Sequence, residues 1–216
     1  MTIRKLLLAI QLCIIPAAAL TADQVARIAS QDLTTYLHSV IRMVPEVKDF
    51  NLTQPSDVDR AVLGSPVRVL AVEDGFDTSA TTVAGITVEA NRWFVPVFID
   101  GTCRFFITVS NLESQGLAPK RVASGFAYLA AEYGKIVSAW PGHAVVLVSG
   151  PKNSGMYFTV AGTGSENLTP IPGPTGKSTS SSGVQPAPGS AYSVLGTVSS
   201  GIATIRNSIA PVGGAR

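Results

Sequence analysis

Cysteine and histidine are scarce in this sequence, and their scarcity excludes several kinds of site. The cysteines are Cys13 and Cys103, and the histidines are His38 and His143. Residues scattered in this way do not form the clustered spacing of a zinc site, so we expect no metal ion and no cofactor. They also give no disulfide framework, which means that a hydrophobic core must hold the fold together.

Charged residues are also few, and lysine and arginine form no cluster. They make up 14% of the chain, with 16 basic and 14 acidic residues. A protein that binds nucleic acid or an anionic membrane needs a basic stripe, so we expect no nucleic-acid partner. The main acidic concentration lacks the ligand spacing of a calcium loop, and it predicts solvated turns at Asp57, Asp59, Glu73, Asp74 and Asp77.

The longest apolar run lies at the N-terminus and has the layout of a secretory signal peptide. Arg4 and Lys5 precede the run Leu6–Ile15, and Pro16 and three alanines follow it. The unbroken run is about half of the roughly 20 residues that a membrane-spanning helix needs, so we favour a signal peptide over an anchor. Its removal as residues 1–22 leaves 14 basic and 14 acidic residues.

Two cleavage points fit this signal peptide. Residues 21–24 match a capping box, in which Thr21 precedes Gln24 by three positions ahead of a helix. Cleavage after Ala19 keeps this cap, whereas cleavage after Ala22 removes it, and the first site also has the better A-x-A pattern. The alanine-rich signal and the lack of disulfides favour export to a bacterial periplasm or the extracellular space.

Beyond the signal, the apolar periodicity predicts one globular domain over residues 23–165. Apolar residues at helical spacing predict a helix over 24–44 that ends before a proline. The period then changes to two, which predicts a strand over 67–72, and 81–90 is a further strand candidate.

The clearest local signal is a β-hairpin over residues 92–109. Its strands are Arg92–Ile99 and Thr102–Val109, and Asp100 and Gly101 between them suit a type I′ turn. Pro96 has no N–H for a sheet ladder, so we expect it at an edge or a bulge.

The second half of the domain is expected to add one helix and three strands. A helix over 121–133 is followed by Gly134 as a C′ residue, and strands are expected over 135–140, 144–149 and 156–161. Tight turns join most neighbours, so the predicted fold class is α+β. A mostly antiparallel sheet of five or six strands packs against the N-terminal helix and the shorter second helix.

The last segment, 166–216, is rich in Ser, Gly and Pro and is predicted to be a flexible tail. A heptad-like apolar stripe runs through it at Leu195, Val198, Ile202, Ile205 and Ile209. The stripe is either chance periodicity or a segment that folds on a partner, and its poor helix formers favour the first interpretation.

Catalytic constellations are weak in this sequence. A thiol-dependent hydrolase could use Cys103 as nucleophile and His143 as base, with Asn153 orienting the base. No helix is predicted to start at Cys103, however, and no protease signature surrounds it, so an ordinary half-buried strand cysteine is favoured. A G-x-S-x-G elbow is also missing. The sequence therefore favours a binding protein over an enzyme.

Aromatic residues concentrate in the hairpin and are the candidate binding residues. They are Trp93, Phe94, Phe98 and Phe105, together with Trp140 in a later turn. Either helices and loops cover both faces of the hairpin, or one face is an exposed patch that marks a partner site.

We therefore expect an exported, non-catalytic protein that binds another protein or a cell-envelope component. The alternatives are the thiol-dependent hydrolase using Cys103 and His143, and a carrier that holds a small apolar ligand between sheet and helix.

Overall fold

The computed structural model describes residues 19–44, 47–73, 82–150, 156–160, 167–171 and 196–197. The helices are α1 (Ala22–Ser30), α2 (Leu33–Met43) and α3 (Ala127–Ala139), with 3₁₀ helices η1 (Val47–Phe50), η2 (Pro55–Arg60) and η3 (Glu113–Gln115). The strands are β1 (Val62–Leu63), β2 (Val67–Val72), β3 (Thr87–Ile99), β4 (Thr102–Ser110), β5 (Lys120–Ser124), β6 (Val145–Ser149), β7 (Met156–Val160), β8 (Asn167–Ile171) and β9 (Gly196–Thr197).

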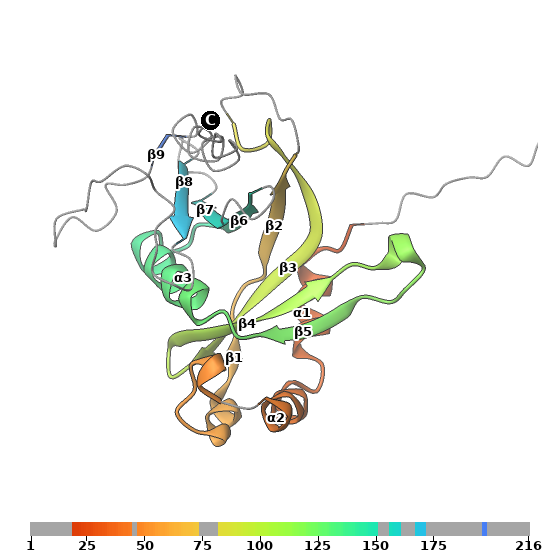
Figure 1. The fold of residues 1–216 in the computed structure, drawn as a ribbon, viewed down its shortest axis with the longest axis vertical. Helices are drawn as coiled ribbons and strands as arrows, with labels where there is room; N and C mark the ends of the chain where they lie inside the picture. Colours follow the sequence, from red (N-terminus) through yellow and green to blue (C-terminus); the bar gives the residue numbers. More distant parts are fainter. Residues whose placement is uncertain are drawn as a thin grey trace, which may run out of the picture.

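The strands of the described residues join into one sheet. Its order is β5-β4-β3-β2-β6-β7-β8-β9, and β1 pairs with β3 (Figure 1). Neighbouring strands run antiparallel, except that β2 and β6 are parallel. The prediction of an α+β fold with a mostly antiparallel sheet is confirmed, and short strands such as β1, β5 and β8 widen the sheet beyond the expected elements.

The β3–β4 hairpin forms as predicted. Asp100 and Gly101 make its turn with φ values of 51° and 75°, the positive values that a type I′ turn requires. The β3–β4 register shifts between Val97 and Phe98, which leaves Arg104 of β4 as the extra residue of a β-bulge. The bulge bends the hairpin just before its turn.

Strand β3 is longer than expected because two predicted strands are one. The candidate over 81–90 contributes only its last residues, which run directly into the strand predicted from Arg92. Asn91 at the junction has a φ of 50°, and the β2–β3 register shifts beside it, between Val69 and Leu70. A bulge at this point keeps one strand continuous where the sequence pattern breaks.

The sheet separates two large hydrophobic cores, which together hold most of the buried apolar side chains. The α1–α2 core lies between the N-terminal helices and one face of β3 and β4, and its fully buried members include Val25, Leu37, Val95, Phe105 and Ile107. The α3 core lies on the opposite face, and its members include Phe94, Phe106, Leu129, Tyr133 and Leu147. A small third core consists of Val72, Val83, Ile86, Val148, Tyr157 and Leu168.

The predicted cap of the first helix is present. The backbone N–H of Thr21 donates to Gln24 Oε1 at 2.8 Å, and the Gln24 N–H donates to Thr21 Oγ1 at 3.3 Å. Leu20, just before the cap, is only 8% exposed and belongs to the α1–α2 core. The residues around the start of α1 are therefore part of the fold.

The prediction of one helix over 24–44 is wrong, because α1 and α2 are separate helices. Asp32 between them adopts left-handed backbone geometry with a φ of 46°. Arg121 of β5 donates to the carbonyls of Ile28 and Ala29 at 3.0 and 3.1 Å, and also to that of Gln31. This distant side chain satisfies the carbonyls at the end of α1, so the helix can stop there.

The region 120–140 also differs from the prediction. Lys120–Ser124 forms strand β5 against β4, and α3 continues through Gly134 to Ala139, where a strand was expected. The apolar spacing runs on past the glycine, because Tyr133 and Ile136 are both buried in the α3 core. A glycine inside a helix costs about 1 kcal/mol relative to alanine, and the burial of these large side chains offsets it.

The folded region extends into the segment expected to be a tail. Strand β8 pairs with β7, and its Leu168 and Ile171 are 1% and 7% exposed. Residues 1–18 of the signal peptide predicted over 1–22, the acidic turn residues Asp74 and Asp77, and the apolar stripe of the tail lie outside the described residues. Among the helices that are described, none is long and apolar enough to cross a membrane.

Candidate functional site

The candidate aromatic residues divide between core positions and partly exposed positions. Phe94 and Phe105 are 5% and 0% exposed, and they belong to opposite cores. Neither can meet a partner in this conformation, which corrects their assignment as surface binding residues. Trp93, Phe98 and Trp140 are half-buried at the margins of the two cores. Helices thus cover both faces of the hairpin, and only these three remain candidates for contact.

An open groove lies where Phe98 and the hairpin turn approach the C-terminal half of α3. We call it the α3 groove, and its volume is about 910 Å³. On the hairpin side it is lined by Phe98, Gly101, Thr102 and Cys103. On the helix side it is lined mainly by small residues, including Ala131, Gly134, Ser138 and Ala139.

The small side chains of α3 leave the groove wide. A Cβ atom placed on Gly134 would meet no atom within 4 Å, so the space beside this residue is free. Lys135 gives the groove a charged rim, where its Nζ lies 2.5 Å from Glu132 Oε1. The surface is therefore apolar at its centre and polar at one margin, which is the usual layout of a binding site.

An open strand edge adjoins the α3 groove. Strand β5 pairs with β4 only over Phe106–Ser110, so residues 102–105 of β4 have β3 on one side and no strand on the other among the described residues. Thr102 and Cys103 belong both to this edge and to the wall of the groove. Such an edge offers main-chain donors and acceptors to an added strand.

Cys103 has the chemistry of a core residue. It is 4% exposed, its Sγ lies 3.9 Å from the carbonyl oxygen of Phe105, and burial raises the pKa of its thiol to about 12. The pKa of the neighbouring Tyr133 is raised to about 12 as well, mainly by burial. A thiol with such a pKa stays protonated near neutral pH, and a protonated thiol is a poor nucleophile.

His143 does not activate this thiol. Its Nδ1 lies 3.2 Å from the Pro141 carbonyl oxygen, its ring packs edge-on against Trp140, and its side chain is exposed. Among the described residues, no hydrogen bond joins His143 to Cys103. The third member of the hypothesis, Asn153, lies outside them.

The acidic residues have structural partners. Asp57 accepts hydrogen bonds from the backbone N–H groups of Thr53 and Gln54 at 2.9 and 3.0 Å, which caps η2. Asp59 lies 2.7 Å from Nε2 of His38 on α2. Within the described residues, no three His, Cys, Asp or Glu side chains gather in a group that could hold a metal ion.

Arg60 links this acidic region to the hairpin turn. Its Nε and terminal N–H₂ groups donate to the two carboxylate oxygens of Asp100 at 3.0 Å each, and it also reaches Asp57 at 3.1 Å. The hydrogen bonds from Arg60 lower the pKa of Asp100, while the backbone hydrogen bond from Gln54 is the main cause that lowers the pKa of Asp57. These contacts hold η2 against the tip of the hairpin.

Comparison with protein-family models, with curated proteins and with solved structures gives no match. The interpretation of the α3 groove therefore depends on its geometry alone.

The sequence indicated only part of this groove. Phe98 was among the predicted binding residues, but the small residues of α3 were not recognised as one surface. The prediction ended the helix at Gly134, so Ala131 and Ser138 were placed on different elements. The signal that could have joined them is the helical spacing of Tyr133 and Ile136 across the glycine.

Proposed function

We propose that this protein is a non-catalytic binding protein that takes an extended segment of another protein into the α3 groove. The observation that carries the proposal is the apolar groove beside the open edge of β4. A partner strand would reach the main chain at the exposed Thr102 and the partly exposed Arg104, because Cys103 and Phe105 are buried. It would place side chains against Phe98 and the small residues of α3. The bulge at Arg104 limits this pairing to a short segment.

A protein partner is favoured over a lipid or glycan of the cell envelope. The strand edge provides main-chain hydrogen bonds at regular spacing, which only another polypeptide strand matches. Small side chains such as Gly134 also allow a partner to approach the helix closely. The protonated, buried thiol of Cys103 gives the groove no nucleophile, which supports a binding role over hydrolysis.

Peptides selected from a random dodecapeptide phage library against the full chain would test this proposal. We expect bound peptides to slow amide hydrogen exchange at Thr102 and Arg104 of β4, and to lose at least tenfold in affinity for an Ala131→Leu/Ser138→Leu variant. Both substituted positions are exposed on α3 and line the groove, so larger side chains there fill it without entering the core. Thr35→Leu, at an exposed position of α2, is the matched control. Failure to select peptides, or equal binding to the double variant, would refute the proposal.

We also propose that the protein is exported and that cleavage follows Ala19. The signal-like layout of the first 22 residues supports export. Cleavage after Ala22 would remove Leu20, which packs in the α1–α2 core, and Thr21, which caps α1. The protein would be expressed in a bacterium and collected from the medium or the periplasm. Its intact mass should correspond to a chain that begins at Leu20. A cytoplasmic product that retains Met1 would contradict this proposal.

A further inference from the structure

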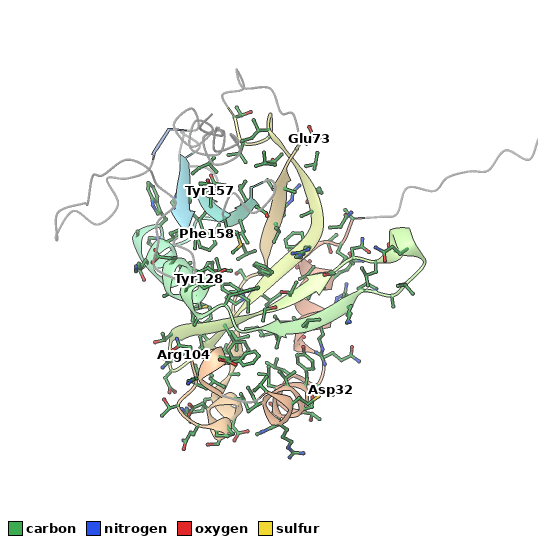
Figure 2. The ribbon with its side chains drawn as sticks, in the orientation of Figure 1. Asp32, Glu73, Arg104, Tyr128, Tyr157 and Phe158 are labelled. Atoms are coloured by element: carbon green, nitrogen blue, oxygen red, sulfur yellow. The ribbon has the colours of Figure 1, made fainter. Side chains whose placement is uncertain are left out.

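Half of one sheet face carries no helix in the described part of the chain. The N-terminal helices cover β3 and β4 on this face, and α3 covers the opposite face. Over β2, β6 and β7, the described residues that cover this face include Val83 and Ile86 of the small core, at one end. Figure 2 labels Tyr157 and Phe158, consecutive residues of β7 that belong to the small core and the α3 core respectively.

An open groove of about 480 Å³ occupies the rest of this face, and we call it the sheet-face groove. Its floor follows the strand register, in which Val146 of β6 lies opposite Arg68 of β2 on one side and Thr159 of β7 on the other. Leu70 extends this floor, and Val83 of the small core adds apolar surface at one end. Apolar surface therefore dominates the centre of the groove.

Thr159 is the unusual residue of this groove. It is only 7% exposed, and its neighbours Phe158 and Val160 both point into the α3 core, so alternation directs Thr159 to the helix-free face. Its hydroxyl group makes no hydrogen bond to any described residue. A buried hydroxyl is normally paired, because leaving it without a partner is unfavourable. The groove thus presents one polar atom that has no hydrogen-bond partner among the residues that the structure describes.

The charges at the rim of the groove balance each other. Arg68 and Glu89 form an ion pair with side chains 50% and 40% exposed. A charged ligand would have to compete with one member of this pair and would leave the other without its partner. The rim therefore favours a ligand without net charge.

We propose that the sheet-face groove binds a small uncharged amphiphile. Its hydroxyl or amide head bonds to the hydroxyl of Thr159, and its short apolar body packs on Leu70, Val83 and Val146. This site is separate from the α3 groove, because the lining of the two grooves shares no residue and comes from opposite faces of the sheet. Its test is therefore independent of the function proposed above.

Titration of the full chain with 1-hexanol, followed by methyl NMR, tests the proposal. We expect saturable shifts of the Leu70, Val83 and Val146 methyl groups. Thr159→Val keeps the shape of the side chain and removes the hydroxyl, so it should weaken hexanol binding about three- to tenfold. Thr35→Val, on the exposed side of α2, is the matched control and should leave binding unchanged.

Two further ligands keep the test independent of any change in folding. 1-Chloropentane has similar length but no hydroxyl, so it should bind the wild type and Thr159→Val equally. Hexanoate should bind more weakly than hexanol, because it carries a charge. The proposal is overturned if hexanol produces no methyl shifts, if Thr159→Val leaves its affinity unchanged, or if hexanoate binds as tightly as hexanol.

Discussion

Replacing Gly134 by alanine should stabilise the protein. Gly134 lies inside the thirteen-residue helix α3, its φ is not positive, and a Cβ atom there would meet nothing within 4 Å. Alanine is favoured over glycine in a helix interior by about 1 kcal/mol, and no clash reduces this gain. For a folded region of this size, the free energy corresponds to an increase in Tm of about 2–4 °C.

Whether Gly134→Ala raises or lowers the free energy of unfolding distinguishes a continuous helix α3 from a helix that ends at Gly134. If the helix ended at Gly134, as the sequence first indicated, the glycine would be a C′ residue with positive φ. Alanine would then cost about 1–2 kcal/mol, because its Cβ disfavours the left-handed conformation. Urea and thermal unfolding followed by circular dichroism measure the difference directly. A lowered midpoint for Gly134→Ala would refute the continuous helix, and with it the helical wall of the α3 groove.

Two other glycines provide controls of opposite sign. Gly101 has a φ of 75° in the hairpin turn, so alanine there should be destabilising. A Cβ on Gly125 would lie 2.3 Å from the backbone oxygen of Asp49, which forces the chain to shift. Both variants should unfold at lower urea concentration than the wild type while Gly134→Ala unfolds at higher concentration. Together, the three variants distinguish the effect of each glycine's local surroundings on stability from a general effect of replacing glycine by alanine.

Three further predictions concern single side chains. Arg121→Met should lower the free energy of unfolding by about 2 kcal/mol in urea titrations, because the carbonyls at the end of α1 lose a charged donor, and an unchanged midpoint would contradict its capping role. In a Cys13→Ser variant, a thiol reagent at pH 8 should modify Cys103 of the native protein at least about a hundredfold more slowly than Cys103 of the protein unfolded in urea. Equal rates would show that Cys103 is not buried. The hydrogen bonds from Arg60 hold the pKa of Asp100 below its ordinary value of 3.8, so this interaction stabilises the fold above that value and is lost as pH falls through the lower native pKa. Arg60→Met should remove this stabilisation. The stability difference between Arg60→Met and the wild type should therefore be full at pH 7 and shrink below about pH 4, and a difference independent of pH would refute this linkage.

Local signals in the sequence predicted the elements whose causes are local. The positive φ values at Asp100 and Gly101 and the alternation on either side define the hairpin within a few residues. The capping box of Thr21 and Gln24 likewise depends on residues only three positions apart. Such features could be predicted from the sequence because no distant residue is needed to form them.

The errors fall where distant residues decide the local structure. The end of α1 depends on Arg121, which lies 93 positions after Ile28, and no pattern near the helix reveals this contact. Gly134 resembled a helix stop because the burial of Tyr133 and Ile136 against the sheet could not be inferred from their neighbours. The position of Thr159 beside Val146 follows from the register of β6 and β7, which only the assembled sheet defines.

The contacts of Arg121 also impose an order of events on folding. Its guanidinium group caps α1 and lies 4.1 Å from the centre of the Tyr36 ring, whose hydroxyl accepts a hydrogen bond from the backbone N–H of Ala123 at 2.7 Å. The N-terminal helices are therefore completed by residues about ninety positions later in the chain. Contacts at such separation form slowly, because a long loop must close first. While the chain is being made, α1 emerges first, but its C-terminal carbonyls receive the Arg121 cap only after β5 has also emerged.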